Sequence, residues 1–200
     1  GDAERLRVQD LWSSLFNGSG ARTGEIDARR DLLEEIVARA SGLPFRRYLA
    51  ERLLEPLGMR SSFYDVPPKT FRGSVARSDE AKKSGWFAGA GDLAIFAQML
   101  LNRGVYDHRR FFSPAAVDRL SAKGGAWSKP SDSDWTGRVF SSSAFGHSSA
   151  NGPSLWIDPA KKLFIIFLTN ADEPLKNQRL IAKVQEAINE AVVQQAIKNE

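Results

Sequence analysis

The sequence predicts an α+β fold, in which a helical region is followed by a small antiparallel sheet and a C-terminal covering helix. Three observations lead to this fold class. Apolar residues recur at helical spacing through residues 1–123, three short strand-like runs follow, and a long amphipathic run closes the chain. Because helices and strands are grouped rather than alternating, the order is not that of a parallel βαβ sheet.

Five helices are expected in the first part of the chain. They lie at residues 5–16, 31–41, 44–57, 92–102 and 113–122. The second has a common apolar face and ends at Gly42; the face consists of Leu32, Leu33, Ile36, Val37 and Ala40. Pro44 opens the third helix, and Pro56 and Gly58 are expected to end it. Its apolar face consists of Phe45, Tyr48, Leu49 and Leu53.

The second part of the chain, residues 124–200, changes character. A polar loop to residue 135 leads into three runs typical of β-strands, GRVFSSSAFGH, PSLWID and KLFIIFLTN, at residues 137–147, 153–158 and 162–170. Pro159 marks a tight turn between the last two. Residues 174–200 are expected to form one helix that covers the sheet. We therefore predict a single domain over residues 1–200, with residues 64–85 as a loop with room for a short strand.

Composition excludes several classes of function. The net charge of +4 comes from scattered basic pairs, so no nucleic-acid partner is expected. The chain has no cysteine, which excludes disulfides, thiolate metal sites and a cysteine nucleophile. Its two histidines, His108 and His147, lack metal-ligand spacing, and the glycine-rich stretches lack nucleotide-loop context, so we predict no metal and no cofactor. No apolar run is long enough to span a membrane, and the polar first residues carry no signal peptide. Because the first residue is Gly rather than Met, we expect a processed chain or one expressed in shortened form.

Four stretches, in matching order, carry a family resemblance. They are LRVQDLWSSLFNGSG, LLEEIVARASGLPFRRYLAERLLEPLGMRSSFY, SGWFAGAGDLAIFAQMLLNRG and FGHSSANGPSLWIDPAKKLFIIFLTN. The P-L-G-M and S-L-W-I-D-P segments are the most specific. In these features the chain resembles β-lactamase-related serine hydrolases of the penicillin-binding-protein-like superfamily, close to class C enzymes and esterases. The resemblance implies an incomplete β-lactamase-like fold that lacks the N-terminal nucleophile segment.

The resemblance also implies acyl-transfer chemistry by a serine and a lysine in an S-x-x-K motif, with a Y-x-N motif and a K-T-G or H-x-G strand. No S-x-x-K occurs in the 200 residues. The Y-x-N motif falls on Glu25, Ile26 and Asp27, where a carboxylate replaces the tyrosine and Asp replaces Asn. Glu25 and Asp27 are the candidate catalytic residues at this position. The simpler interpretation is a solvated loop before a helix.

The H-x-G motif falls on His147, Ser148 and Ser149. His147 is the third candidate catalytic residue, and Ser148, Ser149 and Ala150 are candidate substrate-binding residues. Ser149 replaces a glycine on the strand face that the resemblance turns toward the nucleophile, while the backbone N–H of Ala150 is an expected oxyanion donor. The simpler interpretation of His147 is a strand-end histidine with a satisfied hydrogen bond. No G-x-S-x-G elbow provides another nucleophile.

Three functional hypotheses remain open from the sequence. The chain is a family homologue that is inactive on its own, or the C-terminal part of an active hydrolase whose nucleophile lies upstream, or a binding or interaction domain that keeps the fold. The resemblance implies a peptide, an ester or a cell-wall-derived small molecule as ligand, and a bacterial, extracytoplasmic protein. Because upstream elements would complete the sheet, we also expect a homo-oligomer or association with the missing N-terminal segment.

Overall fold

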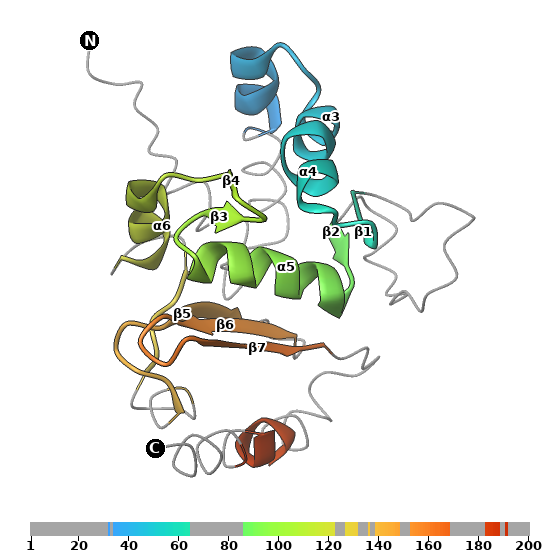
Figure 1. Ribbon diagram of the computed structural model, residues 1–200. Coiled ribbons are helices and arrows are strands. Elements are labelled where there is room, and N and C mark those ends of the chain that lie inside the picture. The colour runs from blue at the N-terminus through green and yellow to red at the C-terminus, as the bar shows by residue number, and fades with distance from the viewer. Residues whose placement is uncertain are drawn as a thin grey trace. The chain divides into compact units, whose positions relative to one another are not determined.

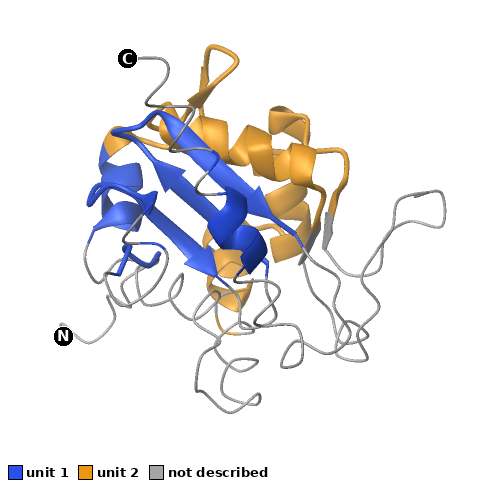
Figure 2. Cartoon of the chain, turned by 90° about the horizontal axis from the view of Figure 1, so that it is seen from below, with its two compact units in different colours: residues 1–19, 115–200 blue, residues 20–114 orange. Residues whose placement is uncertain are grey.

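The computed structural model describes residues 32, 34–64, 86–122, 127–131, 136, 139–148, 153–168, 183–188 and 191. The chain divides into two compact units, residues 20–114 and residues 1–19 together with 115–200 (Figure 2). The helix expected at residues 5–16 lies outside the described residues, and the single domain over residues 1–200 stays a prediction. None of the described helices is long and apolar enough to cross a membrane.

In the unit of residues 20–114, a helix over residues 34–41 is followed by a second helical run (Figure 1). That run comprises α3 (Phe45–Leu49), the π-helical segment η1 (Ala50–Leu54) and α4 (Glu55–Leu57). Gly42 and Gly58 end the two helices at φ values of +71° and +73°, in the left-handed region that favours glycine. Both glycine stops were predicted from the sequence and are confirmed.

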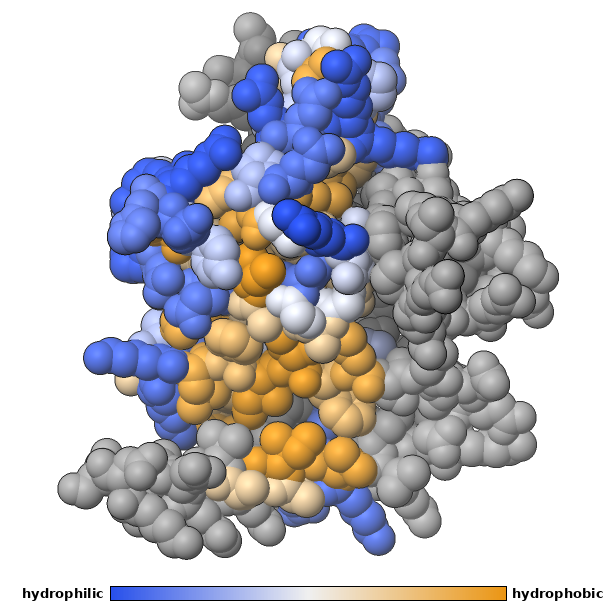
Figure 3. Space-filling model, turned by 45° about the vertical axis from the view of Figure 1, so that its right-hand side comes forward, coloured by the Kyte–Doolittle hydropathy of each residue, from blue (hydrophilic) through white to orange (hydrophobic). Residues whose placement is uncertain are grey.

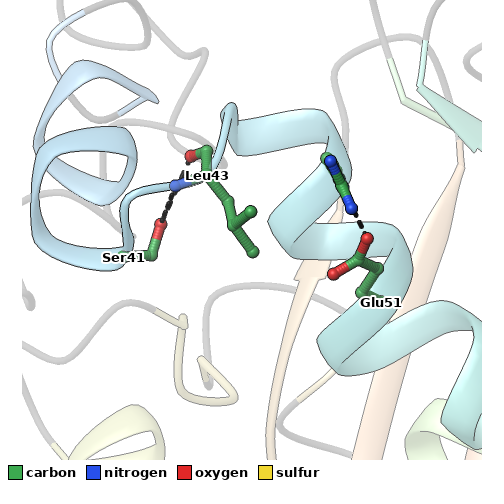
Figure 4. Close-up of polar contacts among 4 residues, drawn as sticks. Ser41, Leu43 and Glu51 are labelled. Carbon is green, nitrogen blue, oxygen red and sulfur yellow. Dashed lines mark hydrogen bonds and ion pairs between the residues drawn. The ribbon is translucent and has the colours of Figure 1, made fainter.

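The side chain of Ser41 shapes the corner between these helices. Its hydroxyl donates to the carbonyl of Val37 at 2.7 Å and accepts the backbone N–H of Leu43 at 3.2 Å (Figure 4). Figure 3 shows mostly hydrophilic side chains at the top of the view, where Figure 1 has the helix over residues 34–41 with α3 below it. In α3 and η1, Arg46, Arg47 and Glu51 are exposed.

The best-buried residues of this helical run differ from the face expected from the sequence. Leu54 and Leu57 are the buried residues, at 7% and 3% exposure, whereas the face predicted from a regular α-helix is only half-buried. The expectation that Pro56 ends the helix is also wrong, because Pro56 lies inside α4. A proline in a helix clashes with the carbonyl four residues earlier, and the wider π turn just before it accommodates this clash.

Two short strands and the best-buried helix of this unit follow. β1 (Ser62–Tyr64) pairs antiparallel with β2 (Trp86–Ala88), and α5 (Ala90–Leu101) begins two residues before the predicted start. The carboxylate of Asp92 accepts the backbone N–H of Ser61 at 2.7 Å and the hydroxyl of Ser62 at 2.8 Å. This buried carboxylate therefore fixes the first turn of α5 to the start of β1.

A small hairpin that the sequence did not predict comes next. β3 (Val105–Tyr106) pairs with β4 (Arg109–Arg110) through a turn at Asp107 and His108, whose φ values are +45° and +59°. Two-residue hairpin turns of this kind usually carry Asn-Gly or Asp-Gly, so Asp-His gives no recognisable signal. α6 (Pro114–Ser121), which belongs to the second unit except for its first residue, forms over the predicted residues.

The second unit contains a three-stranded antiparallel sheet in the order β5 (Phe145–Ser148), β6 (Ser154–Asp158) and β7 (Leu163–Phe167). The predicted first strand began too early. The backbone N–H of Phe140 bonds the carbonyl of Thr136 at 2.9 Å, so this part of the segment is a helical turn. The ring of Phe140 stacks on that of Trp156 at 5.4 Å between centroids, which explains why the apolar pair Val139–Phe140 is buried without being a strand.

The two faces of the sheet bury different residues. On one face, Trp156 packs with Val139, Phe140 and Ala144, and the half-buried Leu163 and Ile165 join this cluster. On the same face the side-chain amide of Gln185, in the described helical residues 183–188, donates to the hydroxyl of Ser154 at 3.4 Å. This part of the predicted covering helix therefore contacts the sheet. The opposite face buries Phe145 and Ile157.

A buried carboxylate joins the β6–β7 turn to the segment before β5. One oxygen of Asp158, which is fully buried, accepts the backbone N–H of Ser141 at 2.7 Å. The other accepts the Ser141 hydroxyl at 2.6 Å and the backbone N–H groups of Ala160 and Lys161 at 3.1 and 3.2 Å. The predicted tight turn at Pro159 is confirmed, and its geometry depends on this carboxylate.

We expect Asp158→Ala to destabilise the protein by at least about 2 kcal/mol, since hydrogen bonds to a charged group each contribute about 1.5–3 kcal/mol. Ser141→Ala should cost less, because the backbone N–H of residue 141 still reaches the carboxylate. Ser142→Ala, at an exposed neighbouring position, is the matched control and should be neutral. Urea unfolding followed by circular dichroism measures all three. Equal stability of the Asp158→Ala and Ser142→Ala variants would contradict this role.

Candidate active site

The candidate active site is built on β5, which is hydrogen-bonded along both edges. Gly146 pairs with Trp156 of β6 on one side. On the other side it exchanges two backbone hydrogen bonds with Ser128, at 2.8 and 3.0 Å. Trp127 packs its ring edge-on against Phe145, at 5.7 Å between centroids. The strand that carries His147 is therefore rigidly placed within its unit.

Gly146 is required here for reasons of space rather than of backbone conformation. A Cβ atom at this position would overlap the backbone carbonyl oxygen of Leu155 and would lie 2.5 Å from Cδ2 and 2.7 Å from Cε3 of the Trp156 ring. Real Cβ atoms do not approach other atoms so closely, so a side chain would displace the indole or the strand. The glycine before His147 thus sets how closely β5 packs against the ring of β6.

His147 lies opposite Leu155 in the pairing of β5 with β6. Side chains of a strand alternate between faces, so the imidazole shares the face of Phe145 and not that of Trp156. His147 is half-buried, and this burial lowers its pKa below the ordinary value of 6.5, because the charged form loses hydration. The imidazole is therefore neutral at neutral pH and can both donate and accept a hydrogen bond.

Ser148 faces the opposite side of the sheet from His147. Ser148 is exposed, and its hydroxyl oxygen accepts the indole N–H of Trp156 at 3.0 Å. The structure therefore does not bring the Ser148 hydroxyl together with the imidazole. The other predicted site residues, Glu25, Asp27, Ser149 and Ala150, lie outside the described residues, and their roles stay predictions.

One basic group near β5 was not singled out by sequence reasoning. The ammonium group of Lys129 donates to the carbonyl of Ser143 at 3.2 Å, and partial burial lowers the pKa of Lys129. Lys129 follows Ser128, the residue paired with β5, so the strand pairing carries it to the edge of the sheet. Its sequence context, a polar loop, contains no signal that would have identified it. Among the described residues, no group of three His, Cys, Asp or Glu side chains could hold a metal ion.

Comparison of the sequence with known protein families assigns the chain to one of them. The family described as Beta-lactamase matches residues 28–189, which is most of the chain. The chain belongs to the β-lactamase family. The predicted resemblance is confirmed, and so is the fold class, which corresponds to part of the β-lactamase fold. The chain therefore has the serine-hydrolase-like scaffold of the β-lactamase family.

Solved structures of this family share the fold at low sequence identity. A β-lactamase from Mycobacterium bovis is 24% identical, with a TM-score of 0.65 over 94% of this chain and 74% of that one. A penicillin-binding protein homologue from Caulobacter crescentus is 19% identical, with a TM-score of 0.56 over 71% of this chain and 51% of that one. At these identities the likeness concerns the fold alone.

Two relatives have names that specify an activity. An N-acetylmuramyl-L-alanine amidase of Bacillus subtilis is 25% identical over 70% of this chain and 42% of its own length. A putative D-alanyl-D-alanine carboxypeptidase of Escherichia coli strain K12 is 22% identical over 77% of this chain and 47% of its own length. The β-lactamase-family chain therefore spans less than half the length of either relative.

Gly146→Ala should destabilise the protein by about 1–3 kcal/mol, the usual cost of overpacking a close contact. Gly91→Ala is the matched control, because no atom lies within 4 Å of a Cβ placed there. It lies in α5, where alanine in place of glycine should be neutral or stabilising by up to about 1 kcal/mol. Chemical denaturation compares the two variants. Equal stability of the two variants would show that the surroundings of Gly146 accommodate a methyl group without loss of stability, and would contradict this role.

The stability of the protein should fall as the pH drops below about 6.5. The folded state holds His147 at a lowered pKa, so in this range the unfolded chain binds more protons than the folded one. This contribution to stability is fully present above the unfolded pKa and is lost as the pH falls toward the folded pKa. Urea midpoints measured on both sides of this pH should show the decline, and His147→Gln should make it shallower. An unchanged pH dependence in the variant would rule out this assignment.

Proposed function

We propose that this β-lactamase-family chain binds an acyl compound beside β5 without forming an acyl-enzyme from its own residues. One contrast carries the proposal. The first position of the strand-edge motif, His147, lies on a rigidly paired strand next to the closely packed Gly146, whereas S-x-x-K occurs nowhere in the 200 residues. The features that place the strand are kept, and the motif that supplies a nucleophile and its base is absent from this sequence.

The properties of His147 support a binding role. A half-buried imidazole with a lowered pKa stays neutral at neutral pH, so it can accept a hydrogen bond from an amide N–H or donate one to a carbonyl. In the proposed site Ser149 would occupy the glycine position and narrow the approach to the strand, and the backbone N–H of Ala150 would remain as a donor. Glu25 and Asp27 would face this wall from the Y-x-N position.

The named relatives suggest the ligand class. One is an amidase of N-acetylmuramyl-L-alanine and the other a putative carboxypeptidase of D-alanyl-D-alanine. We therefore propose a muramyl or D-alanyl peptide as the ligand to try first, and an ester as the second choice.

An alternative proposal is that these residues form the C-terminal part of an active hydrolase. It is supported by the span of the match, which covers less than half the length of either named relative. In that case the nucleophile and its lysine would come from residues outside this sequence, and His147 would line their cleft. The changes at Glu25 and Ser149 favour the first proposal, because a shorter chain does not by itself change residues at motif positions.

Covalent labelling of the 200-residue protein, combined with a binding measurement, tests the first proposal. We expect no adduct with a fluorescent penicillin or a fluorophosphonate probe, because the chain contains no S-x-x-K serine. A muramyl peptide ending in D-alanyl-D-alanine should nevertheless raise the melting temperature in a saturable way, and His147→Ala should weaken this shift. Labelling that one serine substitution abolishes would overturn the binding proposal. No labelling together with no thermal shift for peptide or ester would overturn it as well.

A further inference from the structure

The helix over residues 34–41 turns an apolar stripe toward solvent. Leu32 is 47% exposed and Ile36 is 36% exposed, and Ala40 is exposed one turn later. Residues spaced by four lie on one side of a helix, so these three form a continuous line. Ala38, on the opposite side, and Val37, which flanks the line next to Ala40, are half-buried. The apolar stripe predicted for this helix is therefore mostly on its outer side, where large apolar residues are unusual in a row.

An ion pair lies along one border of this stripe. The guanidinium Nε of Arg39 contacts Oε1 of Glu35 at 2.6 Å, and the two side chains are 81% and 56% exposed. At 100° per residue, Glu35 and Arg39 follow each other on the same border, next to Leu32, while Ala40 occupies the other border. One border of the stripe therefore carries a negative charge, Glu35, and one turn later a positive charge, Arg39, whereas the other border is apolar.

This pattern is complementary to itself. When two helices pack antiparallel about a two-fold axis, each border faces the same border of the partner helix, which runs in the opposite direction. Glu35 of one copy then comes opposite Arg39 of the other, and the reverse pair forms at the same time. In a parallel arrangement the charged border would face the uncharged border instead. We propose that this face, defined by Leu32, Glu35, Ile36, Arg39 and Ala40, binds a second copy of the chain in an antiparallel helix pair.

The size of the face determines what kind of dimer to expect. A stable interface of standard size buries about 800 Å² on each partner, which three apolar side chains on a helix of about three turns do not reach. The dimer should therefore be reversible and depend on protein concentration. Because the charged pairs are exposed, it should also weaken as salt is added.

Sedimentation equilibrium over a range of protein and salt concentrations tests the proposal. We expect Ile36→Ser to shift the protein toward monomer by removing the central apolar contact. Glu35→Lys and Arg39→Glu should each do the same, because each places like charges opposite one another across the two-fold axis. Mixing these two variants should restore association, since a border with two positive charges then meets one with two negative charges.

Mixing the two variants distinguishes a loss of contacts between the copies from a loss of stability within each helix. Each single variant also loses the Glu35–Arg39 pair inside its own helix, and mixing cannot restore that pair. Glu51→Lys is the matched control, because it makes the same change in another exposed pair four residues apart, Arg47 with Glu51 at 2.5 Å (Figure 4). It should leave association unchanged. A monomer at every concentration, association that is indifferent to Ile36→Ser, or variants that do not associate on mixing would each overturn the proposal.

Discussion

The sheet that carries the candidate site depends on the buried carboxylate of Asp158. A charge without water is costly unless donors surround it, and here one hydroxyl and three backbone N–H groups do so. Ser141 supplies two of these donors, and the turn after β6 supplies the other two. The full set exists only when the turn and the segment before β5 are both in place. Strand pairing then transmits this constraint to Gly146 and His147.

Local signals explain most of what the sequence predicted about the fold. Glycine stops such as Gly42 and the proline turn after Asp158 are properties of a few neighbouring residues, so they can be recognised without a structure. The π turn before Pro56 could not be recognised from the sequence, because an analysis of helical periodicity assumes 3.6 residues per turn. The β3–β4 hairpin was missed because Asp107 and His108 adopt positive φ without a glycine. In the first predicted strand, the apolar residue Phe140 is buried by stacking on the distant Trp156 and not by the expected strand pairing.

The candidate site divides in a similar way. His147 was found through a resemblance in motif order, and its place on β5 was correctly expected from the strand pattern. The lowered pKa of its imidazole depends on burial, which a single sequence does not reveal. Ser148 was a substrate-binding candidate because it occupies the second position of the motif, and in the structure its hydroxyl accepts the indole N–H of Trp156 on the face opposite His147. Lys129 is carried to β5 by strand pairing alone.

The groups that hold β5 in place are distinct from those that acyl transfer requires. Close packing of Gly146 on Trp156, the Asp158 network and the pairing with Ser128 depend on shape and hydrogen bonds, and none of them needs a serine nucleophile or its lysine. Loss of the nucleophile would therefore leave the strand and its neutral imidazole unchanged. Hydrogen bonding to an amide uses the same rigid edge whether or not the bond is later cleaved. For this reason the proposed ligand binding would be separable from turnover.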